Sequence, residues 1–252
     1  MTTTEAATPR SPEPPTPLAA PADAPVEPAP GARCFGDGDP LYEEYHDTEW
    51  GRPVHGEEAL FERLALEAFQ SGLAWITVLR KRPAFREAFA GFDPSVVAQF
   101  SETDVERLLQ DASIIRNRLK IEATVSNARA LLALHEQGRT LDELVWSFAP
   151  GGSRAPDDGT PVDRPRPRTF ADVAASTPES VALATALKKE GFRFIGPTTA
   201  YAAMQACGLV DDHVVTCPVV TGHVRAGAST ASRREGAPPE HEPPAPQGLS
   251  TL

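Results

Sequence analysis

The sequence predicts an all-α domain, because helical hydrophobic periods recur along its centre, no alternating strand pattern is present, and both ends lack any hydrophobic period. Residues 1–32 contain nine prolines, and residues 219–252 are rich in Pro, Gly, Ser, Arg and Glu. Neither tail carries enough apolar surface to offset the entropy lost on ordering, so both are expected to be disordered. The domain is therefore expected to span residues 33–218, a length sufficient for one well-filled core.

The first half of the domain contains three predicted helices. Residues 57–71 place large apolar side chains at helical spacing after an acidic start, which suits the positive end of a helix dipole. Residues 83–90 begin with a proline, which is well tolerated at the first helical position. Ser101, followed three residues later by Asp104, is typical of a capping arrangement and predicts a short helix.

The longest helical pattern covers residues 114–137, with apolar residues on or near one face and Gly138 at its end. Residues 149–169 are rich in Pro, Gly and Asp, and they predict a loop. A further helix is expected to open at Thr177 and to run to Lys189.

The last predicted helix begins at Pro197 and ends just before Gly208. With the helix before it, this helix forms a hairpin that exposes the backbone N–H groups of its first turn, and such groups suit a DNA phosphate. Gly196, Thr198 and Thr199 are the candidate DNA contacts. The alternative is an ordinary packed helix pair joined by a Gly-Pro turn, because helical hairpins are common.

Composition limits the partners of this protein. The net charge is -11, of which residues 1–32 contribute -3 and the C-terminal tail nothing, which leaves -8 for the domain. Long-range attraction to phosphate is therefore not expected, and any DNA binding must come from a local patch. Three cysteines, an odd number without an export signal, predict a reducing cytoplasm. No apolar stretch reaches membrane-spanning length, so no membrane contact is expected.

Four residues at opposite ends of the domain form a candidate metal site. Cys34 and His46 lie near its start, and His213 and Cys217 lie at its end. Two Cys and two His are a ligand mix of closed structural zinc sites, and such a site would join the two ends of the domain. From spacing alone, the alternative is that the cysteines are buried thiols without a metal.

Several long blocks of the sequence are rich in rare residue types. They read RC, DPLYEEYHDTEWG, LEAFQSGLAWITVLRKR, DASIIRNRLKI with SNARA, VWSF, and LKKEGFRFIGPTTAYAAMQACGLVDDHVVTC, and they span residues 33–217. In this order they resemble the bacterial 3-methyladenine DNA glycosylase I family. The stretch between Cys34 and Asp39 is a residue shorter than the family form and lacks its tryptophan.

The resemblance implies an all-α, helix-hairpin-helix glycosylase fold with a structural zinc ion that joins the two ends of the domain. Its zinc ligands fall on Cys34, His46, His213 and Cys217. It also implies removal of 3-methyladenine from alkylated double-stranded DNA, in the bacterial cytoplasm and in association with the nucleoid through that DNA.

The resemblance also implies a base pocket. Its carboxylate falls on Glu67 and its stacking aromatics on Tyr45 and Trp75, with Tyr42 and Trp50 nearby. N3-methylation makes adenine cationic, so aromatic faces attract the ring and a carboxylate accepts a hydrogen bond from its amine. Without the family context, Glu67 fits a helix-surface acid equally well, and the aromatic residues fit core packing.

Two further groups of residues are candidates for contact with the substrate. Gly72 and Leu73 lie in a predicted turn between helices, where a small apolar wedge would fill the gap left by a flipped nucleotide. Asp211 and Asp212 lie about where related enzymes carry an Asp that steadies the sugar cation. The alternative is that these two carboxylates cap or orient the His213 ligand.

The predicted enzyme is a monofunctional, monomeric glycosylase with water as its nucleophile, so no lysine is required to form a Schiff base. Two other classes of protein remain open. One is a non-catalytic protein that binds alkylation damage in DNA, which an assay for released base would distinguish. The other is a hydrolase with a catalytic zinc, which would need an open coordination position that four protein ligands do not leave.

Overall fold

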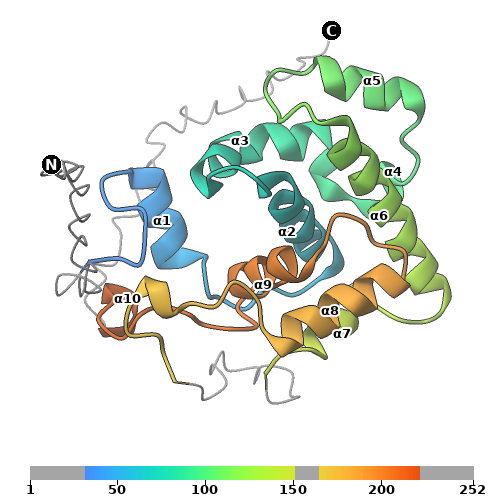
Figure 1. The fold of residues 1–252 in the computed structure, drawn as a ribbon. Helices are drawn as coiled ribbons and strands as arrows, with labels where there is room; N and C mark the ends of the chain where they lie inside the picture. Colours follow the sequence, from blue (N-terminus) through green and yellow to red (C-terminus); the bar gives the residue numbers. More distant parts are fainter. Residues whose placement is uncertain (1–31, 151–164, 222–252) are drawn as a thin grey trace, which may run out of the picture.

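The computed structural model describes residues 32–150 and 165–221, and within these ranges every regular element is a helix, as predicted. Both predicted tails and most of the predicted 149–169 loop lie outside the described residues. The α-helices are α1 (Pro40–Thr48), α2 (Glu57–Gln70), α3 (Trp75–Ala88), α4 (Pro94–Val97), α5 (Glu102–Gln110), α6 (Arg118–Glu136), α7 (Leu141–Trp146), α8 (Pro178–Lys189), α9 (Pro197–Ala206) and α10 (Pro218–Thr221), with 3-10 turns η1 (Ala90–Phe92) and η2 (Phe170–Asp172) (Figure 1).

Four predicted helices are confirmed as α2, α5, α8 and α9, and side-chain capping accounts for the starts of α5 and α8. Asp104 Oδ2 accepts a hydrogen bond from the backbone N–H of Ser101 at 2.9 Å. Thr177 Oγ1 accepts one from the backbone N–H of Ser180 at 3.3 Å. These side chains satisfy amide groups that have no partner inside the helix.

Two predicted helix starts were wrong. The helix expected at 83–90 begins at Trp75, and Pro83 lies inside it. The residues before Pro83 include Val78 and Leu79, whose burial in the core offsets the hydrogen bond that the proline removes. The helix expected from residue 114 begins at Arg118, because the Asn117 side chain accepts a hydrogen bond from the third residue of the helix and caps it.

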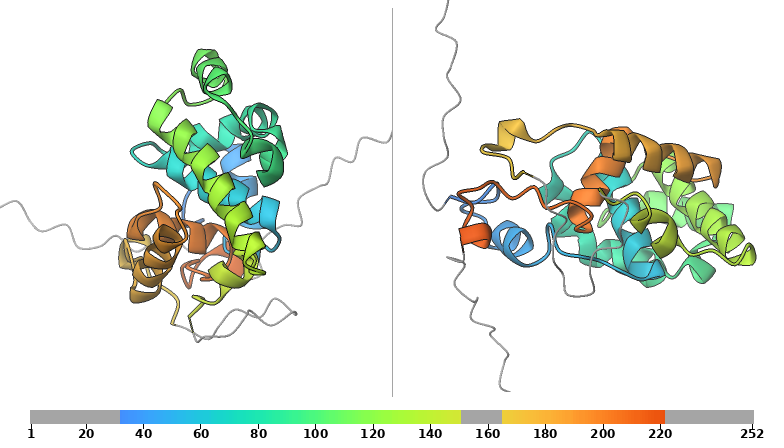
Figure 2. Two further views of the ribbon diagram at one scale, coloured as in Figure 1. Left: turned by 90° about the vertical axis from the view of Figure 1, so that its right-hand side faces the viewer. Right: turned by 90° about the horizontal axis from the view of Figure 1, so that it is seen from below.

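The core forms around α2, in which every residue from Leu60 to Phe69 is buried. Helices α3, α6, α7 and α9 pack against it, and α8 packs along α9 (Figure 1). Two views agree that α1 and α10 lie at one end of the molecule and that α4, α5 and α6 lie towards the other (Figure 2). None of the described helices is long and apolar enough to cross a bilayer.

The segment after α1 lies against the C-terminal end of α9, which brings the two ends of the described chain together. Gly51 N donates to the Gln205 carbonyl and Val54 N to the Cys207 carbonyl, each at 3.0 Å. Gly208 has a positive φ of 69° and contacts the backbone of Arg52 so closely that an added Cβ would lie 2.3 Å from the Arg52 carbonyl carbon. Only glycine fits there without displacement of the chain.

Candidate active site

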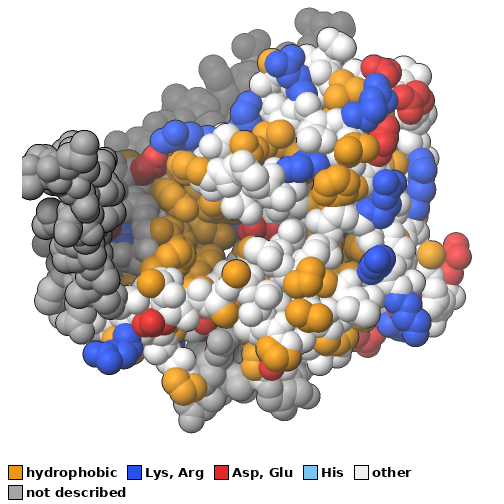
Figure 3. Space-filling view, in the orientation of Figure 1, with side chains coloured by type: hydrophobic (Ala, Val, Ile, Leu, Met, Phe, Trp, Pro, Cys, Tyr) orange, Lys and Arg blue, Asp and Glu red, His pale blue; other side chains and the backbone are white. Residues whose placement is uncertain are grey.

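A cavity of about 260 Å³ lies between α1, α2, α3 and α9. On the face shown in Figure 3, hydrophobic side chains gather around a hollow between these helices. The five predicted pocket residues line this one cavity, and five further residues share its wall. The complete lining is Phe35, Tyr42, Tyr45, Trp50, Glu67, Gln70, Trp75, Phe170, Ala202 and Gln205.

Glu67 is the acidic residue of this cavity lining, and its side chain is not on the helix surface. The residue is 5% exposed, and burial raises the pKa of its carboxyl from 4.5 to about 8, although nearby Arg63 lowers it somewhat. Among the described residues, no hydrogen-bond donor contacts the carboxyl. The carboxyl is therefore available for a group that enters the cavity.

Aromatic rings make most of the cavity wall. The centroids of the Tyr45 and Trp75 rings are 5.3 Å apart, and those of Phe35 and Tyr42 are 4.9 Å apart. Within the described part of the chain, the indole N–H of Trp75 is buried and has no hydrogen-bond partner. Packed rings of this kind present π faces to a flat, cationic ligand.

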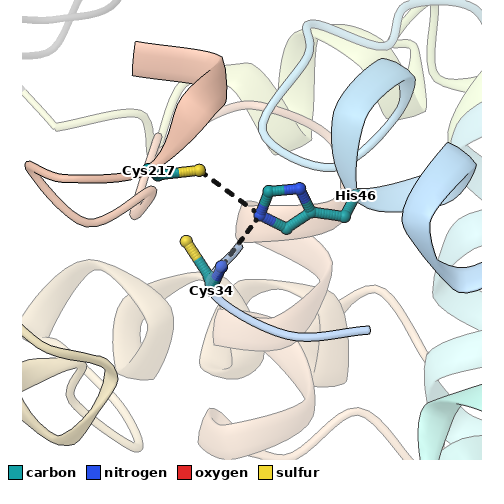
Figure 4. Close-up of side chains that lie close together, drawn as sticks. All are labelled: Cys34, His46 and Cys217. Carbon is teal, nitrogen blue, oxygen red and sulfur yellow. Dashed lines mark hydrogen bonds between the residues drawn. The ribbon is translucent and has the colours of Figure 1, made fainter. Parts of the chain in front are cut away.

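Three of the four predicted metal ligands lie together. The ligand atoms of Cys34, His46 and Cys217 are all within 4.8 Å of one another (Figure 4). His46 Nε2 accepts a hydrogen bond from the backbone N–H of Cys34 at 3.2 Å and lies 3.6 Å from Cys217 Sγ. Hydrogen bonds with Cys34 and His46 lower the pKa of the Cys217 thiol. A thiolate with a thiol and an imidazole beside it is a donor set that suits zinc.

The fourth predicted ligand, His213, lies beside this cluster. Its ring centroid is 4.8 Å from that of His46, and its Nε2 lies 3.3 Å from the His46 carbonyl oxygen. In both histidines Nδ1 contacts a neighbouring carboxylate, Asp47 at 2.8 Å and Asp211 at 2.7 Å. Each carboxylate is in turn bound by an arginine. Such carboxylates fix the orientation of ligating histidine rings in metal sites.

The cluster and the cavity share aromatic residues. Trp50 lines the cavity, and its ring centroid is 4.7 Å from that of His213. Phe35 also lines the cavity, with its ring 4.9 Å from that of His46. The positions of the side chains in the candidate metal cluster are therefore coupled by direct packing to the shape of the cavity.

Asp212 does not line the cavity. It is buried, and its Oδ2 accepts hydrogen bonds from the Tyr201 hydroxyl at 2.6 Å and from Gln205 Nε2 at 2.8 Å. Gln205 is a cavity residue, so the structure places Asp212 behind the wall, where it orients the Gln205 side chain. Asp211, by contrast, contacts His213, as the second interpretation of these residues expected.

The candidate DNA contacts lie in two exposed turns. Gly72 has a positive φ of 85° and Leu73 is 40% exposed, in the turn between α2 and α3. Gly196 occupies the N-cap position of α9, and Thr198 and Thr199 lie in the first turn of that helix. Gly196 and Thr198 are exposed, and Thr199 is half-buried.

The comparison with known proteins assigns the family. Residues 35–220 match the family model of methyladenine glycosylases. The chain belongs to the methyladenine glycosylase family. It is 48% identical over 188 residues to the DNA-3-methyladenine glycosylase 1 of Escherichia coli (strain K12), an alignment that covers 73% of this chain and 94% of that protein. The family expected from the sequence blocks is thus confirmed.

Solved structures of family members superpose on this chain. The crystal structure of a 3-methyladenine DNA glycosylase I matches with a TM-score of 0.68 at 49% identity, and it covers 74% of this chain and 98% of that one. The enzyme from Staphylococcus aureus, solved to show how it recognises 3-methyladenine, matches with a TM-score of 0.67 at 35% identity over 74% of this chain and 94% of that one. The fold of this chain is therefore that of the methyladenine glycosylases.

The sequence did not point to half of the cavity lining. Phe35 adjoins the Cys34 ligand candidate, and Gln70 follows Glu67 by three residues on the same helix, so both had a positional signal. Ala202 and Gln205 are three residues apart on α9 and share a face. Phe170 directly follows the predicted 149–169 loop, and nothing in its local pattern marks it.

Proposed function

We propose that this chain hydrolyses the N-glycosidic bond of 3-methyladenine in alkylated double-stranded DNA, as a monofunctional glycosylase. The observation that carries the proposal is the buried, uncompensated carboxyl of Glu67 among the rings of Tyr45 and Trp75. Membership of the methyladenine glycosylase family and the names of the Escherichia coli and Staphylococcus aureus relatives support it.

The cavity selects the damaged base by its charge. A flipped 3-methyladenine carries a fixed positive charge, which aromatic faces attract by up to about 2 kcal/mol when it is desolvated. At neutral pH, Glu67 is mostly protonated, because its pKa is about 8. A cationic ring favours the carboxylate, which then accepts a hydrogen bond from the exocyclic amine. Neutral adenine supplies no charge to stabilise the ionised carboxyl, so the cavity binds neutral adenine less tightly than the cationic base.

The bond-breaking step needs little acid catalysis. Water forms a bond to C1′ of the sugar while the bond from C1′ to the base breaks. The base leaves with that electron pair, which neutralises its positive charge, and the water loses one proton to solvent. The role of the protein is to extrude the nucleotide, hold the base and leave room for water.

We further propose that Cys34, His46, His213 and Cys217 hold a structural zinc ion. The close approach of three of these residues, and the carboxylates that orient both histidines, support the assignment. Bound zinc would supply folding stability to the two ends of the domain. The rings of Trp50 and Phe35 lie between this cluster and the cavity, which fits a role away from the chemistry.

We propose DNA contact by Gly72 and Leu73 on one turn and by Gly196, Thr198 and Thr199 on the hairpin. The exposure of Leu73 and the open first turn of α9 support these roles. The enzyme is expected to act as a monomer on nucleoid DNA in the cytoplasm.

The test is incubation of the purified protein with methylated duplex DNA, followed by identification of the freed base by mass spectrometry. Release of 3-methyladenine is expected, with loss of release in Glu67→Gln. Glu62→Gln is the matched control, because Glu62 is buried on the same helix but bound to Arg86 outside the cavity. Tight binding of methylated DNA without release would instead identify a damage-binding protein. Immediate loss of release on chelation, with the fold intact, would identify a catalytic metal.

A further inference from the structure

Helix α6 carries two buried polar side chains that bind the two candidate DNA-contacting turns. They are Lys120, which is 8% exposed, and Asn127, which is 2% exposed. Seven residues separate them, which is two helical turns and about 10 Å along one face. Neither side chain lines the cavity or belongs to the metal cluster.

Lys120 binds the end of α2. Its Nζ donates to the carbonyl oxygens of Phe69 at 2.9 Å and Ser71 at 2.7 Å. Carbonyls at the end of a helix have no partner within it, and a cation at that end also suits the helix dipole. Burial lowers the pKa of Lys120, so its burial has a cost in free energy that these two contacts offset. The turn with Gly72 and Leu73 follows directly.

Asn127 binds the hairpin between α8 and α9. Its Nδ2 donates to the Arg193 carbonyl at 3.1 Å, and its Oδ1 accepts from the Arg193 N–H at 2.7 Å. The side chain thus pairs with both backbone groups of one residue, which fixes that residue in position and orientation. The hairpin also lies beside α6 at Gly191, where an added Cβ would come within 3.6 Å of the Ala130 Cβ, an ordinary van der Waals distance. Arg193 lies three residues before Gly196.

We propose that α6 fixes the separation of the 70–73 turn and the 191–196 hairpin, and that Lys120 and Asn127 are positioning residues for DNA. This inference rests on the proposed function, which assigns DNA contact to both turns. A duplex has to be held by its backbone and opened at one nucleotide at the same time. The two contacting turns come from distant parts of the sequence, so a rigid element must set the distance between them. Helix α6 contacts both through hydrogen bonds of buried side chains.

The test compares Asn127→Ala and Lys120→Met with the control Thr124→Val. Thr124 is buried between the two on α6, but its hydroxyl donates only to the Lys120 carbonyl of its own helix. Three quantities are measured for each variant: the KM for methylated duplex, the Kd for an undamaged duplex, and the Kd for free 3-methyladenine from quenching of tryptophan fluorescence. For Asn127→Ala and Lys120→Met we expect both DNA constants to rise by about tenfold or more, because each variant loses the hydrogen bonds that hold one DNA-contacting turn in place.

The affinity for free 3-methyladenine is expected to be unchanged in Asn127→Ala and Thr124→Val, because neither side chain lines the cavity. Lys120 holds the carbonyls on either side of the cavity residue Gln70, so for Lys120→Met the loss of DNA affinity is expected to exceed any loss of free-base affinity. Equal DNA constants in Asn127→Ala, Lys120→Met and Thr124→Val would overturn the inference, and so would an equal loss of DNA and free-base affinity. If a variant does not fold, Asn127→Asp, which keeps the acceptor for the Arg193 N–H but loses the donor to its carbonyl, and Lys120→Gln, which is shorter and uncharged, replace it with the same expectations. A wild-type protein that releases no 3-methyladenine would refute the proposed function, while the Kd for DNA would still decide the role of α6.

Discussion

Replacement of Glu67 by Gln is expected to stabilise the protein while it removes activity. Burial raises the pKa of this carboxyl from 4.5 to about 8. In the unfolded chain the group therefore ionises near pH 4.5, whereas the folded protein holds the proton until about pH 8. Because the folded pKa is the higher one, the stability linked to this group is complete below pH 4.5 and is lost as the pH rises towards 8.

The magnitude follows from the two pKa values. The loss of stability is under about 1 kcal/mol at pH 5, about 3 kcal/mol at pH 7 and about 5 kcal/mol above pH 8. Gln has nearly the same size as Glu but no charge, so Glu67→Gln should not show this loss. The variant should therefore exceed the wild type in stability by an amount that grows with pH and levels off above pH 8.

Urea unfolding of both proteins at pH 5, 7 and 8.5 measures this difference. Glu62→Gln is again the control, because Glu62 is ion-paired with Arg86 at 2.8 Å and its replacement should give no gain that rises with pH. A constant difference between Glu67→Gln and the wild type across these pH values would refute the reasoning, since it would mean that the carboxyl ionises at an ordinary pH. The stabilised variant should still fail to release 3-methyladenine, a trade-off typical of active sites.

Three further predictions follow from the same structure. The kcat/KM of the wild type should rise with pH through a midpoint near pH 8 and level off above it, because ionised Glu67 is the form that binds the cationic base. A flat profile from pH 6 to 9 would contradict this. Cys217→Ser should lower both the melting temperature and the zinc content measured by plasma mass spectrometry. A wild-type protein that contains no zinc, with a Cys217→Ser variant of the same melting temperature, would rule out the structural zinc. Gly208→Ala should lower the free energy of unfolding by more than the ~1–2 kcal/mol that a non-glycine residue costs in the left-handed conformation, because its Cβ would also collide with Arg52. Gly138→Ala is the control, because Gly138 has a similar φ but open space around it, and it should lose only that ~1–2 kcal/mol. Urea unfolding of both variants measures the difference.

Much of the fold was predictable because local signals agree with the tertiary structure. The capping residues Ser101 and Thr177 and the glycine at position 208 mark helix ends that the structure confirms. The start of α3 was not predictable, because Pro83 is a strong local signal that core packing overrides. Helix α1 was also missed, although the Asp39 side chain caps it, because its aromatic residues pack into a small second hydrophobic cluster and not into the main core.

The sequence allowed five residues of the cavity wall to be predicted, but not the other five. Glu67, Tyr45 and Trp75 were placed in one pocket by family resemblance, and the structure brings them together. Phe170 and Gln205 belong to the same wall, but they come from separate segments of the chain. Only the tertiary fold places them there, so no spacing rule along the sequence identifies them.

The surroundings of Glu67 have to allow both ionisation of its carboxyl and binding of a cationic base. A positive group near the carboxyl lowers its pKa and eases ionisation, but it would also repel a cationic base. Arg63 supplies that positive charge, and it is itself bound by Glu49 at 2.6 Å. Burial alone would raise the pKa of Glu49, but hydrogen bonds from Arg82 and Arg63 bring it to about 2, so it stays ionised. Glu49 therefore offsets part of the charge of Arg63 behind the cavity wall, although it is shared with Arg82. Glu67 is left as the group whose charge an incoming cation can stabilise. A neutral base gains nothing from this arrangement, and discrimination against undamaged adenine follows from that difference.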